Sequence, residues 1–273
     1  MTVHVVTAVH NRYAITKRFI GILKSQTHKD IHLILVDDGC TDGTSQMVQK
    51  EYPSSTILHG NGNLWWGGAL QLAYEELLNK KLDDDDVIFF VNDDSRWQPD
   101  YIEKAINILE ENPTCLLTGC GYGVDTKRYL DGPIEFNLKN GAVSLLAPGS
   151  KSNCSSTRSL CLFYGVLKKI GGFHPILLPH YASDYEYTIR ATKKGYPIIS
   201  DESLKYEFTE DTTGDNSRKN ITLKRIFSKR SKLNPFYKLS FILLIAPIYR
   251  LPSYIIYQIK HFKNHGRDSG KAL

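Results

Sequence analysis

Short apolar runs alternate with stretches of helical periodicity through the first half of the chain. Val3–Val9, Ile31–Val36 and Val87–Val91 are apolar runs of strand length, and the last is unbroken, as in a central strand covered on both faces. Between them, apolar residues recur at helical spacing over Ile15–Leu23 and Ala69–Leu78. The pattern predicts an α/β, Rossmann-like fold with a mostly parallel central sheet flanked by helices.

The second half of the chain is less informative. Residues 121–159 are rich in Gly, Ser and Asn and indicate only loops and short strands. The other expected elements are helices near 45–52, 99–111 and 184–194, strands at 55–58, 114–119 and 196–200, apolar structure at 160–166 and a turn at 168–173. Because residues 211–220 are polar, we expect one domain over 1–215 and an extension over 216–273.

Acidic residues recur where predicted elements begin or end. Asp37 and Asp38 follow the second strand, Asp93 and Asp94 follow the unbroken apolar strand, and Asp184 stands at the start of a helix. Ligands of open α/β sheets bind at the carboxyl ends of the strands, so folding could gather these acids at one edge. Hard divalent cations prefer carboxylate oxygens, and the sequence therefore predicts a metal-binding edge. The four acids at 83–86 are interpreted as a solvated loop.

Charge divides the chain into two unlike parts. Residues 216–273 hold 13 Lys and Arg against one acidic residue, a formal charge of +12, whereas residues 1–215 hold 21 basic and 28 acidic residues, a charge of −7. The acidic part suits a metal site. The basic part suits an anionic lipid surface or nucleic acid.

The apolar character of the extension decides between those partners. Residues 236–259 are apolar and aromatic, but Lys238, Arg250 and two prolines interrupt them, and the longest uncharged run, 239–249, has 11 residues. A helix that crosses a membrane needs about 20 consecutive apolar residues. We expect a basic, amphipathic helical segment lying on an anionic membrane surface and no nucleic-acid partner. The expected lipid contacts are Tyr237, Tyr249, Tyr254, Tyr257, Lys224, Arg225, Lys229, Arg230 and Lys232. A plain helical extension that packs on the body is the alternative.

The cysteines and the first residues indicate the compartment. Five cysteines without a C-x-x-C pair favour a reducing environment over a disulfide framework. Residues 1–13 enter a strand directly, without a charged segment followed by an apolar run. We expect a cytoplasmic protein held peripherally at the inner face of the cell membrane.

Four motifs occur in an order that resembles family 2 glycosyltransferases of GT-A fold. They are VDDGCTDGT (36–44), GNLWWGGA (62–69), VNDDS (91–95) and PHYASDYEYTIRATKKGY (179–196), and the likeness covers roughly residues 3–214. The tryptophan motif and the last motif resemble a rhamnosyltransferase-like subgroup that builds bacterial surface polysaccharides, such as O-antigen or capsule. The resemblance implies inverting transfer from a nucleotide-sugar donor, with UDP-hexose and dTDP-rhamnose both admissible, to a lipid-linked glycan acceptor.

The same resemblance assigns the donor site. Asp38 corresponds to the residue that binds the nucleobase, with Ala8, His10 and Arg12 beside it, and Asp93 faces the ribose. Asn63, Trp65 and Gly68 are expected to contact the donor, because indoles pack on sugar faces and glycines admit phosphate. The alternatives are a capped turn at Asp38 and core packing of Trp65 and Trp66.

The catalytic assignments follow in the same way. Asp94 corresponds to the ligand of Mg²⁺ or Mn²⁺, which neutralises the departing diphosphate, and Asp184 to the base that takes the acceptor's proton. Asp184 could instead be a helix N-cap. His180 and Glu186 are candidates for acceptor contacts, although a lone histidine is more often structural and Glu186 could orient a loop.

One departure from the family concerns the metal. Many relatives carry a further histidine ligand after the last strand, but no histidine occurs between His180 and His261. Asp201, Glu202 or Glu207 could replace it. Otherwise Asp94, donor phosphates and water hold an exchangeable cation.

Two other classes of protein stay open. A sugar-nucleotide pyrophosphorylase would share the sheet but should carry a Gly-rich basic loop near the start, which residues 7–13 lack. A non-catalytic glycan-binding or membrane-scaffold protein would keep the aromatic residues without needing Asp94 and Asp184.

Overall fold

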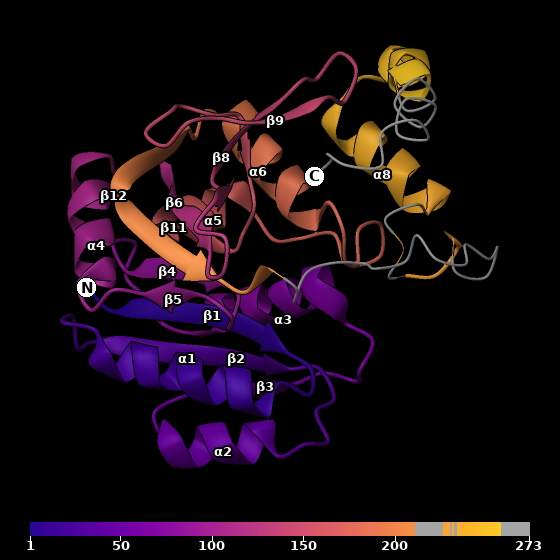
Figure 1. The fold of residues 1–273 in the computed structure, drawn as a ribbon. Helices are drawn as coiled ribbons and strands as arrows, with labels where there is room; N and C mark the ends of the chain where they lie inside the picture. Colours follow the sequence, from indigo (N-terminus) through magenta and orange to yellow (C-terminus); the bar gives the residue numbers. More distant parts are fainter. Residues whose placement is uncertain (211–225, 230, 232–233, 258–273) are drawn as a thin grey trace.

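The computed structural model describes residues 1–210, 226–229, 231 and 234–257, and it has the predicted α/β fold (Figure 1). Four parallel strands form the first half of the main sheet, in the order β3-β2-β1-β4. Their bounds are β1 Val3–Val9, β2 Ile31–Asp37, β3 Thr56–His59 and β4 Val87–Val91. The connecting helices are α1 Tyr13–Ser25, α2 Thr44–Glu51 and α3 Trp65–Asn79. All the elements predicted here are confirmed to within a few residues.

The second half of the main sheet mixes strand directions. β11 (Ser159–Phe163) runs antiparallel between β4 and β6 (Leu116–Gly123), and β12 (Ile198–Phe208) is parallel to β6. The short β5 (Arg96–Trp97) is antiparallel to β12, and β7 (Tyr129–Asp131) pairs with β6. Because β5 follows β4 directly in the sequence and ends this path, the Asp93–Asp94 turn connects the last strand of the first half to the far edge of the second half.

A second sheet, β10-β8-β9, accounts for much of the segment predicted only as loops and short strands. Its strands are β8 Pro133–Phe136, β9 Val143–Leu145 and β10 Cys154–Ser155. Further helices are α4 Tyr101–Glu111, α5 Tyr164–Ile170, α6 Ser183–Lys193 and α8 Pro235–Ile245, and a 3₁₀ turn, η2, follows α8 at Ile248–Arg250.

Two boundaries differ from the prediction. The turn expected at 168–173 is wrong in its first half, because α5 continues to Ile170, whose side chain is buried, and ends at Gly171 with φ +91°. β12 continues to Phe208 beyond the predicted Ser200, since Leu204, Tyr206 and Phe208 alternate inward into the core.

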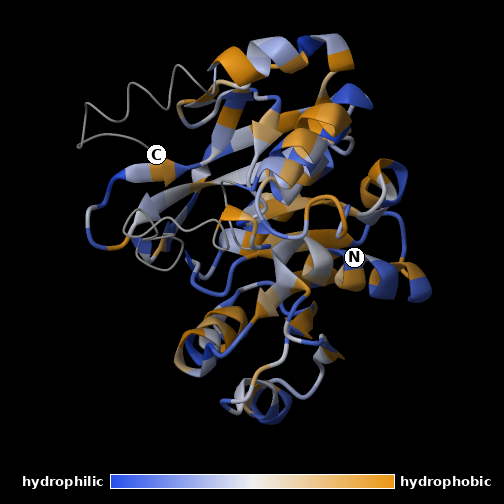
Figure 2. Cartoon of the chain, turned by 90° about the vertical axis from the view of Figure 1, so that its right-hand side faces the viewer, coloured by the Kyte–Doolittle hydropathy of each residue, from blue (hydrophilic) through white to orange (hydrophobic). Residues whose placement is uncertain are grey.

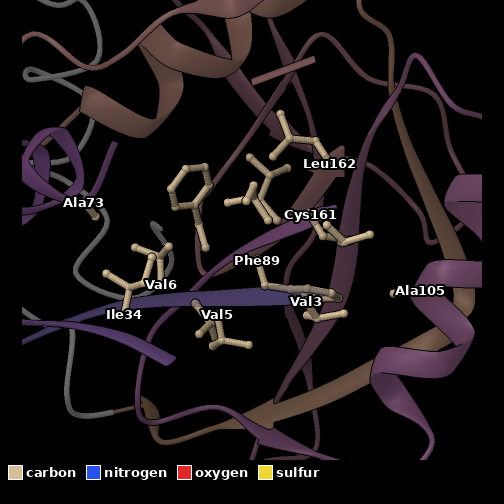
Figure 3. Packing of buried hydrophobic residues seen from close by; sticks show 14 of the residues in the cluster. Val3, Val5, Val6, Ile34, Ala73, Phe89, Ala105, Cys161 and Leu162 are labelled. Atoms are coloured by element: carbon tan, nitrogen blue, oxygen red, sulfur yellow. The ribbon is translucent and has the colours of Figure 1, made fainter. Parts of the chain in front are cut away.

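The main core lies between the sheet and its helices. Every residue of β4 is buried, as its unbroken apolar run predicted. Figure 3 shows Phe89 of this strand close to Val3 and Val5 of β1, with Ala73 of α3 and Ala105 of α4 on opposite sides of the group. Figure 2 shows the same concentration of hydrophobic residues in the central strands.

The described part of the extension packs on the body. Ile242 and Ile245 of α8 join Ile189 of α6 and Phe136 of β8 in a second hydrophobic cluster. Tyr254, expected at lipid headgroups, is instead buried in this cluster and donates to the carbonyl of Leu138 at 3.0 Å. The segment 248–250 leaves Tyr249 exposed. Lys224, Arg225, Arg230, Lys232 and the predicted boundary at 215/216 lie outside the described residues.

Candidate active site

The Asp38 carboxylate, just after β2, accepts hydrogen bonds from the residues at the start of α3. Its Oδ1 accepts the backbone N–H groups of Gly62 (2.8 Å) and Leu64 (3.2 Å), and its Oδ2 accepts that of Trp65 (3.0 Å). The N–H groups of Leu64 and Trp65 are at the helix start and have no partner within the helix. His10 Nδ1 lies 2.6 Å from the Asp38 carbonyl oxygen. Asp38, His10 and the tryptophan motif are therefore brought together, while the nucleobase role stays a prediction.

The loop held by Asp38 has an unusual backbone. Trp65 has φ +58°, a conformation that costs energy for a residue with a side chain. A Cβ on Gly39 would lie 2.9 Å from Gly62 Cα, so only glycine allows the two turns to approach this closely. Strain of this kind persists where the surroundings enforce it, and the three N–H bonds to Asp38 supply that constraint.

The two tryptophans of the motif point to different neighbours. The Trp66 indole N–H donates to Thr157 Oγ1 at 2.8 Å, and the ring packs against the core. The Trp65 ring lies 5.4 Å from the His180 ring, centroid to centroid. Trp65 thus joins the motif that carries Asp184, whereas Trp66 anchors α3 to the segment before β11.

The start of α3 touches the segment that leads into α6. Gly67 donates its backbone N–H to the Pro179 carbonyl at 2.8 Å, and a Cβ at this position would lie 2.4 Å from the Leu178 carbonyl oxygen. Gly68 is buried in α3, Asn63 is exposed, and Ala8 at the end of β1 is half-buried. Their expected donor contacts stay predictions.

Asp93 and Asp94 are buried beside arginines. Arg12 Nε lies 2.8 Å from Asp93 Oδ1, and the Thr16 hydroxyl donates to Asp93 Oδ2 at 2.8 Å. Burial raises the pKa of Asp93 above its usual value, although Arg12 opposes this effect. Asp94 Oδ1 accepts a hydrogen bond from Arg158 Nη1 at 3.0 Å, and Asp94 Oδ2 lies 3.9 Å from Arg12 Nη2. Positive charge therefore surrounds the two carboxylates.

Sequence reasoning missed Arg158 and Asp131. Arg158 bridges Asp94 and Asp131, the latter at 3.9 Å, and its guanidinium stacks 4.2 Å from the centre of the Phe208 ring. Burial lowers the pKa of Arg158, but Asp94, Tyr206 and Asp131 outweigh it, so the pKa is raised above its ordinary value. Both residues come from the weakly periodic segment 121–159, where no local signal marks them.

Few side chains of the described residues are placed to coordinate a metal ion. Within the described ranges, no group of three or more His, Cys, Asp and Glu side chains could hold an ion. Asp201 accepts from Ser203 and Glu207 pairs with Lys127, so neither Asp201 nor Glu207 joins Asp94 in such a group. Mg²⁺ commonly keeps several waters and takes one or two carboxylates together with substrate phosphates. Asp94 has the carboxylate chemistry for that arrangement, while its role as metal ligand stays a prediction.

Asp184 lies in the first turn of α6 and is half-buried. The N-cap position is Ala182, with φ +65°, so the alternative of Asp184 as N-cap is wrong. Burial and the nearby Asp131 raise the pKa of Asp184 to about 6, while the backbone N–H groups of Tyr185 and Thr157 act to lower it. A carboxyl group with this pKa is ionised near neutral pH and is more basic than an ordinary aspartate.

Consecutive residues link Asp184 with Asp94. The Thr157 backbone N–H lies near enough to the Asp184 carboxylate to oppose the rise in its pKa, and the next residue, Arg158, pairs with Asp94. The Thr157 hydroxyl also accepts from Trp66. The tryptophan motif, the strand-end acids and Asp184 therefore meet around the short segment that precedes β11.

Glu186 and His180 lie on opposite sides of Asp184 in the sequence and differ in environment. The Glu186 carboxylate is buried and pairs with Arg190 at 2.8 Å, and Arg190 also donates to the carbonyls of Ile170 and Gly172. Glu186 thus holds the connection between α5 and α6. The His180 ring lies against Tyr181 and Trp65. Their acceptor contacts stay predictions.

The site thus combines an α/β sheet, paired strand-end acids and a nearby basic carboxylate. Residues 4–167 match the family described as glycosyl transferase family 2. Since the match covers more than half of the chain, the chain belongs to this family, as its four motifs predicted.

Curated relatives match part of the chain. It is 28% identical over 102 residues to an N-acetylglucosaminyl-diphospho-decaprenol L-rhamnosyltransferase of Mycobacterium tuberculosis, a match that covers 36% of this chain and 33% of the relative. It is 25% identical over 123 residues to a glucosyl-dolichyl phosphate glucuronosyltransferase of Haloferax volcanii, a match that covers 44% of this chain and 37% of the relative. The matches thus span only about a third of each relative's length.

Solved structures resemble the whole fold. Residues 1–349 of S. aureus TarS, in complex with UDP-GlcNAc, align with a TM-score of 0.63 at 14% identity, covering 96% of this chain and 73% of that chain. The mannosyltransferase PcManGT of Pyrobaculum calidifontis, in complex with GDP-Man and Mn²⁺, aligns with a TM-score of 0.60 at 14% identity. This alignment covers 99% of this chain and 76% of that chain. These similarities confirm the GT-A fold.

Proposed function

We propose that this chain transfers a sugar from a nucleoside-diphosphate sugar to a hydroxyl of a lipid-linked glycan, with inversion at the anomeric carbon. The observation that carries the proposal is the convergence of Asp184, Arg158 and Asp94 on one short segment. Membership of glycosyl transferase family 2 favours sugar transfer over the pyrophosphorylase alternative. The nucleotide sugars bound by two solved structures of the same fold support the donor class.

Asp184 acts as the general base. As the acceptor oxygen attacks the anomeric carbon, its proton passes to the Asp184 carboxylate, and the bond from that carbon to the phosphate oxygen breaks on the opposite face. A new glycosidic bond forms and the nucleoside diphosphate departs with the electron pair. The pKa of about 6 suits this task, because the group is unprotonated at neutral pH yet basic enough to accept the proton.

Positive charge at the strand end stabilises the leaving diphosphate. Arg12 and Arg158 lie against Asp93 and Asp94, where the donor phosphates would approach. A Mg²⁺ or Mn²⁺ ion held by Asp94, donor phosphates and water would add further neutralisation of the departing charge. The Mn²⁺ named with PcManGT and its GDP-Man supports this choice of cofactor.

A membrane-held acceptor fits the surface of the extension. Phe236, Leu239 and Leu243 stand three and four positions apart on α8 and are all at least 41% exposed. Within the part of the chain that the structure describes, no helix is both long and apolar enough to cross a bilayer. An apolar helix face beside a basic segment suits peripheral binding to an anionic inner membrane surface. The relative from Mycobacterium tuberculosis, whose name includes diphospho-decaprenol, supports a lipid-linked acceptor.

A donor screen tests the proposal. UDP-hexoses and dTDP-rhamnose are incubated with the chain and Mg²⁺ or Mn²⁺, and release of nucleoside diphosphate is measured with and without a lipid-linked acceptor. Asp94→Ala and Asp184→Asn should each lower turnover about 100-fold or more, whereas Asp85→Asn, at an exposed acid in the loop before β4, should leave turnover unchanged. Equal turnover in Asp94→Ala, Asp184→Asn and the unchanged chain would exclude the mechanism. Glycan binding without turnover of any donor would favour the non-catalytic alternative.

A further inference from the structure

A second concave site lies beyond the Asp93–Asp94 turn, between β5, α4, β6 and β12. Its cavity has a volume of about 490 Å³, and the lining includes Arg96, Trp97, Lys104, Tyr122, Lys205 and Tyr206. Apart from Glu207, which the sequence offered as a metal ligand and which pairs with Lys127, none of the residues assigned to donor, metal or acceptor lines it. The cavity is therefore a different place from the transfer site, although β5 joins the two.

The lining carries an excess of positive charge. Four basic side chains face two acidic ones, Asp100 and Glu207. Lys104 pairs with Asp100 at 2.8 Å and Lys127 with Glu207 at 2.7 Å, which uses both acids. Arg96 and Lys205 remain without a carboxylate partner among the described residues, so the cavity has two cations available for an anionic ligand.

Two buried donors in the lining also lack acceptors. Arg96 Nε and the Trp97 indole N–H are inaccessible to solvent and have no hydrogen-bond partner within the described chain. Trp97 itself is 5% exposed and stacks on Tyr101 at 4.8 Å between ring centres. Buried donors without acceptors are rare in native proteins and carry a free-energy cost. Since both donor atoms are shielded from solvent, a ligand in the cavity would meet them only if these side chains moved.

The remaining lining suits a carbohydrate. Gln98 and Ser203 offer amide and hydroxyl groups for sugar hydroxyls, and Tyr122 is half-buried and offers part of an aromatic ring. Mixed apolar rings and a few polar groups are typical of small-ligand sites. We propose that this cavity binds a saccharide unit bearing a carboxylate or phosphate, with the acidic group held by Arg96 and Lys205.

Side-chain contacts connect the cavity lining with the transfer site. The Tyr206 hydroxyl, from the cavity lining, donates to Asp131 at 2.5 Å, and Arg158 bridges Asp131 to Asp94. A ligand in the cavity is therefore connected to Asp94 through Tyr206, Asp131 and Arg158. The site therefore favours glycans with acidic units near the point of transfer, a selectivity beyond the proposed reaction itself.

Equilibrium binding tests the inference independently of turnover. Isothermal titration of the full chain, without donor, uses trigalacturonate for the carboxylate, glucose 1-phosphate for the phosphate, and maltotriose and inorganic phosphate as controls. At least one acidic saccharide should bind 10-fold or more tightly than both controls, and its affinity should fall with salt. Lys205→Glu and Arg96→Gln should each weaken that binding about 10-fold or more, because each removes a charge-assisted contact.

Matched variants separate this site from the reaction. Lys50→Glu makes the same charge change at an exposed position on α2, outside the cavity, and should leave affinity unchanged. Asp184→Asn should bind the acidic saccharide like the unchanged chain even though its turnover falls about 100-fold or more. Binding that is equal for acidic and neutral saccharides, equal for inorganic phosphate, or insensitive to both cavity variants would overturn the inference.

Discussion

Arg158 Nη1 lies 3.0 Å from Asp94 Oδ1, and the two side chains are only 11% and 1% exposed. A buried cation thus occupies one oxygen of the carboxylate expected to hold the metal. Removing one partner of a buried pair leaves an uncompensated charge and costs about 3–5 kcal/mol. The same removal takes away a cation that competes with the metal for Asp94.

Arg158→Gln should therefore lower stability while strengthening metal binding. We expect a loss of about 3–5 kcal/mol in the free energy of unfolding by urea titration, and a lower apparent Kd for Mn²⁺ in the presence of UDP. The control is Lys104→Gln, which breaks the exposed pair with Asp100 and should cost at most about 1 kcal/mol. A weaker affinity for Mn²⁺ in Arg158→Gln would mean that Arg158 helps to build the metal site rather than competing with it.

The activity should depend on pH through Asp184. Because its pKa is raised to about 6, log kcat/KM should fall with a slope near one as pH drops below 6, where the base becomes protonated. Asp184→Asn should lower kcat/KM by about 10²–10⁴-fold, the usual contribution of a positioned base. A rate that is flat from pH 7 to pH 5 would remove Asp184 from the base role.

Ionisation of Asp184, which the reaction requires, should lower the stability of the folded chain. The unfolded pKa is near 3.9, so between about pH 4 and 6 the folded state binds more protons than the unfolded state, and stability falls as pH rises through this window. Asn cannot ionise. Asp184→Asn should therefore melt higher than the unchanged chain at pH 8 and similarly at pH 4.5, in thermal unfolding followed by circular dichroism. Asp85→Asn, at an exposed position, should show no such pH-dependent difference.

The contact between α3 and the start of α6 can be tested with two glycines. A Cβ on Gly67 would lie 2.4 Å from the Leu178 carbonyl oxygen and 3.0 Å from Ser183 Cβ, so Gly67→Ala must separate the tryptophan motif from the Asp184 motif. We expect a loss of about 1–3 kcal/mol in unfolding free energy and a lower kcat. Gly21→Ala, on α1 with nothing within 4 Å, should stabilise by up to about 1 kcal/mol. If Gly67→Ala behaved like Gly21→Ala, the close approach would be of no consequence.

The parts of this fold that sequence predicts are those with local signals. β4 could be placed because five consecutive apolar residues fit a strand buried on both faces, and Asp93 and Asp94 were placed with it. Asp38 was found as a turn acid next to β2. The family resemblance, not periodicity, distinguished these acids from ordinary turn residues.

The missed features depend on long-range contacts. The small sheet pairs Ile134 with Leu145 and with Cys154, across intervals that carry no regular apolar pattern. Arg158 gains its importance only when β11 places it beside Asp94, 64 positions earlier in the chain. Nothing in the residues around Arg158 distinguishes it from an exposed arginine, so spacing alone could not identify it.

The exposed face of α8 gives the last prediction. Leu239 and Leu243 are 41% and 47% exposed, whereas Ile242 and Ile245 on the other face are buried against α6 and the small sheet. Since the exposed pair does not support the fold, Leu239→Gln combined with Leu243→Gln should leave the melting temperature nearly unchanged. Each lost leucine contact with lipid should cost up to about 1.5–3 kcal/mol, so affinity for vesicles of phosphatidylglycerol and phosphatidylcholine should fall 10-fold or more. Leu78→Gln, at a 44% exposed leucine on α3, is the control and should bind vesicles normally. Co-sedimentation measures the binding, and unchanged affinity in the double variant would show that this face does not contact the membrane.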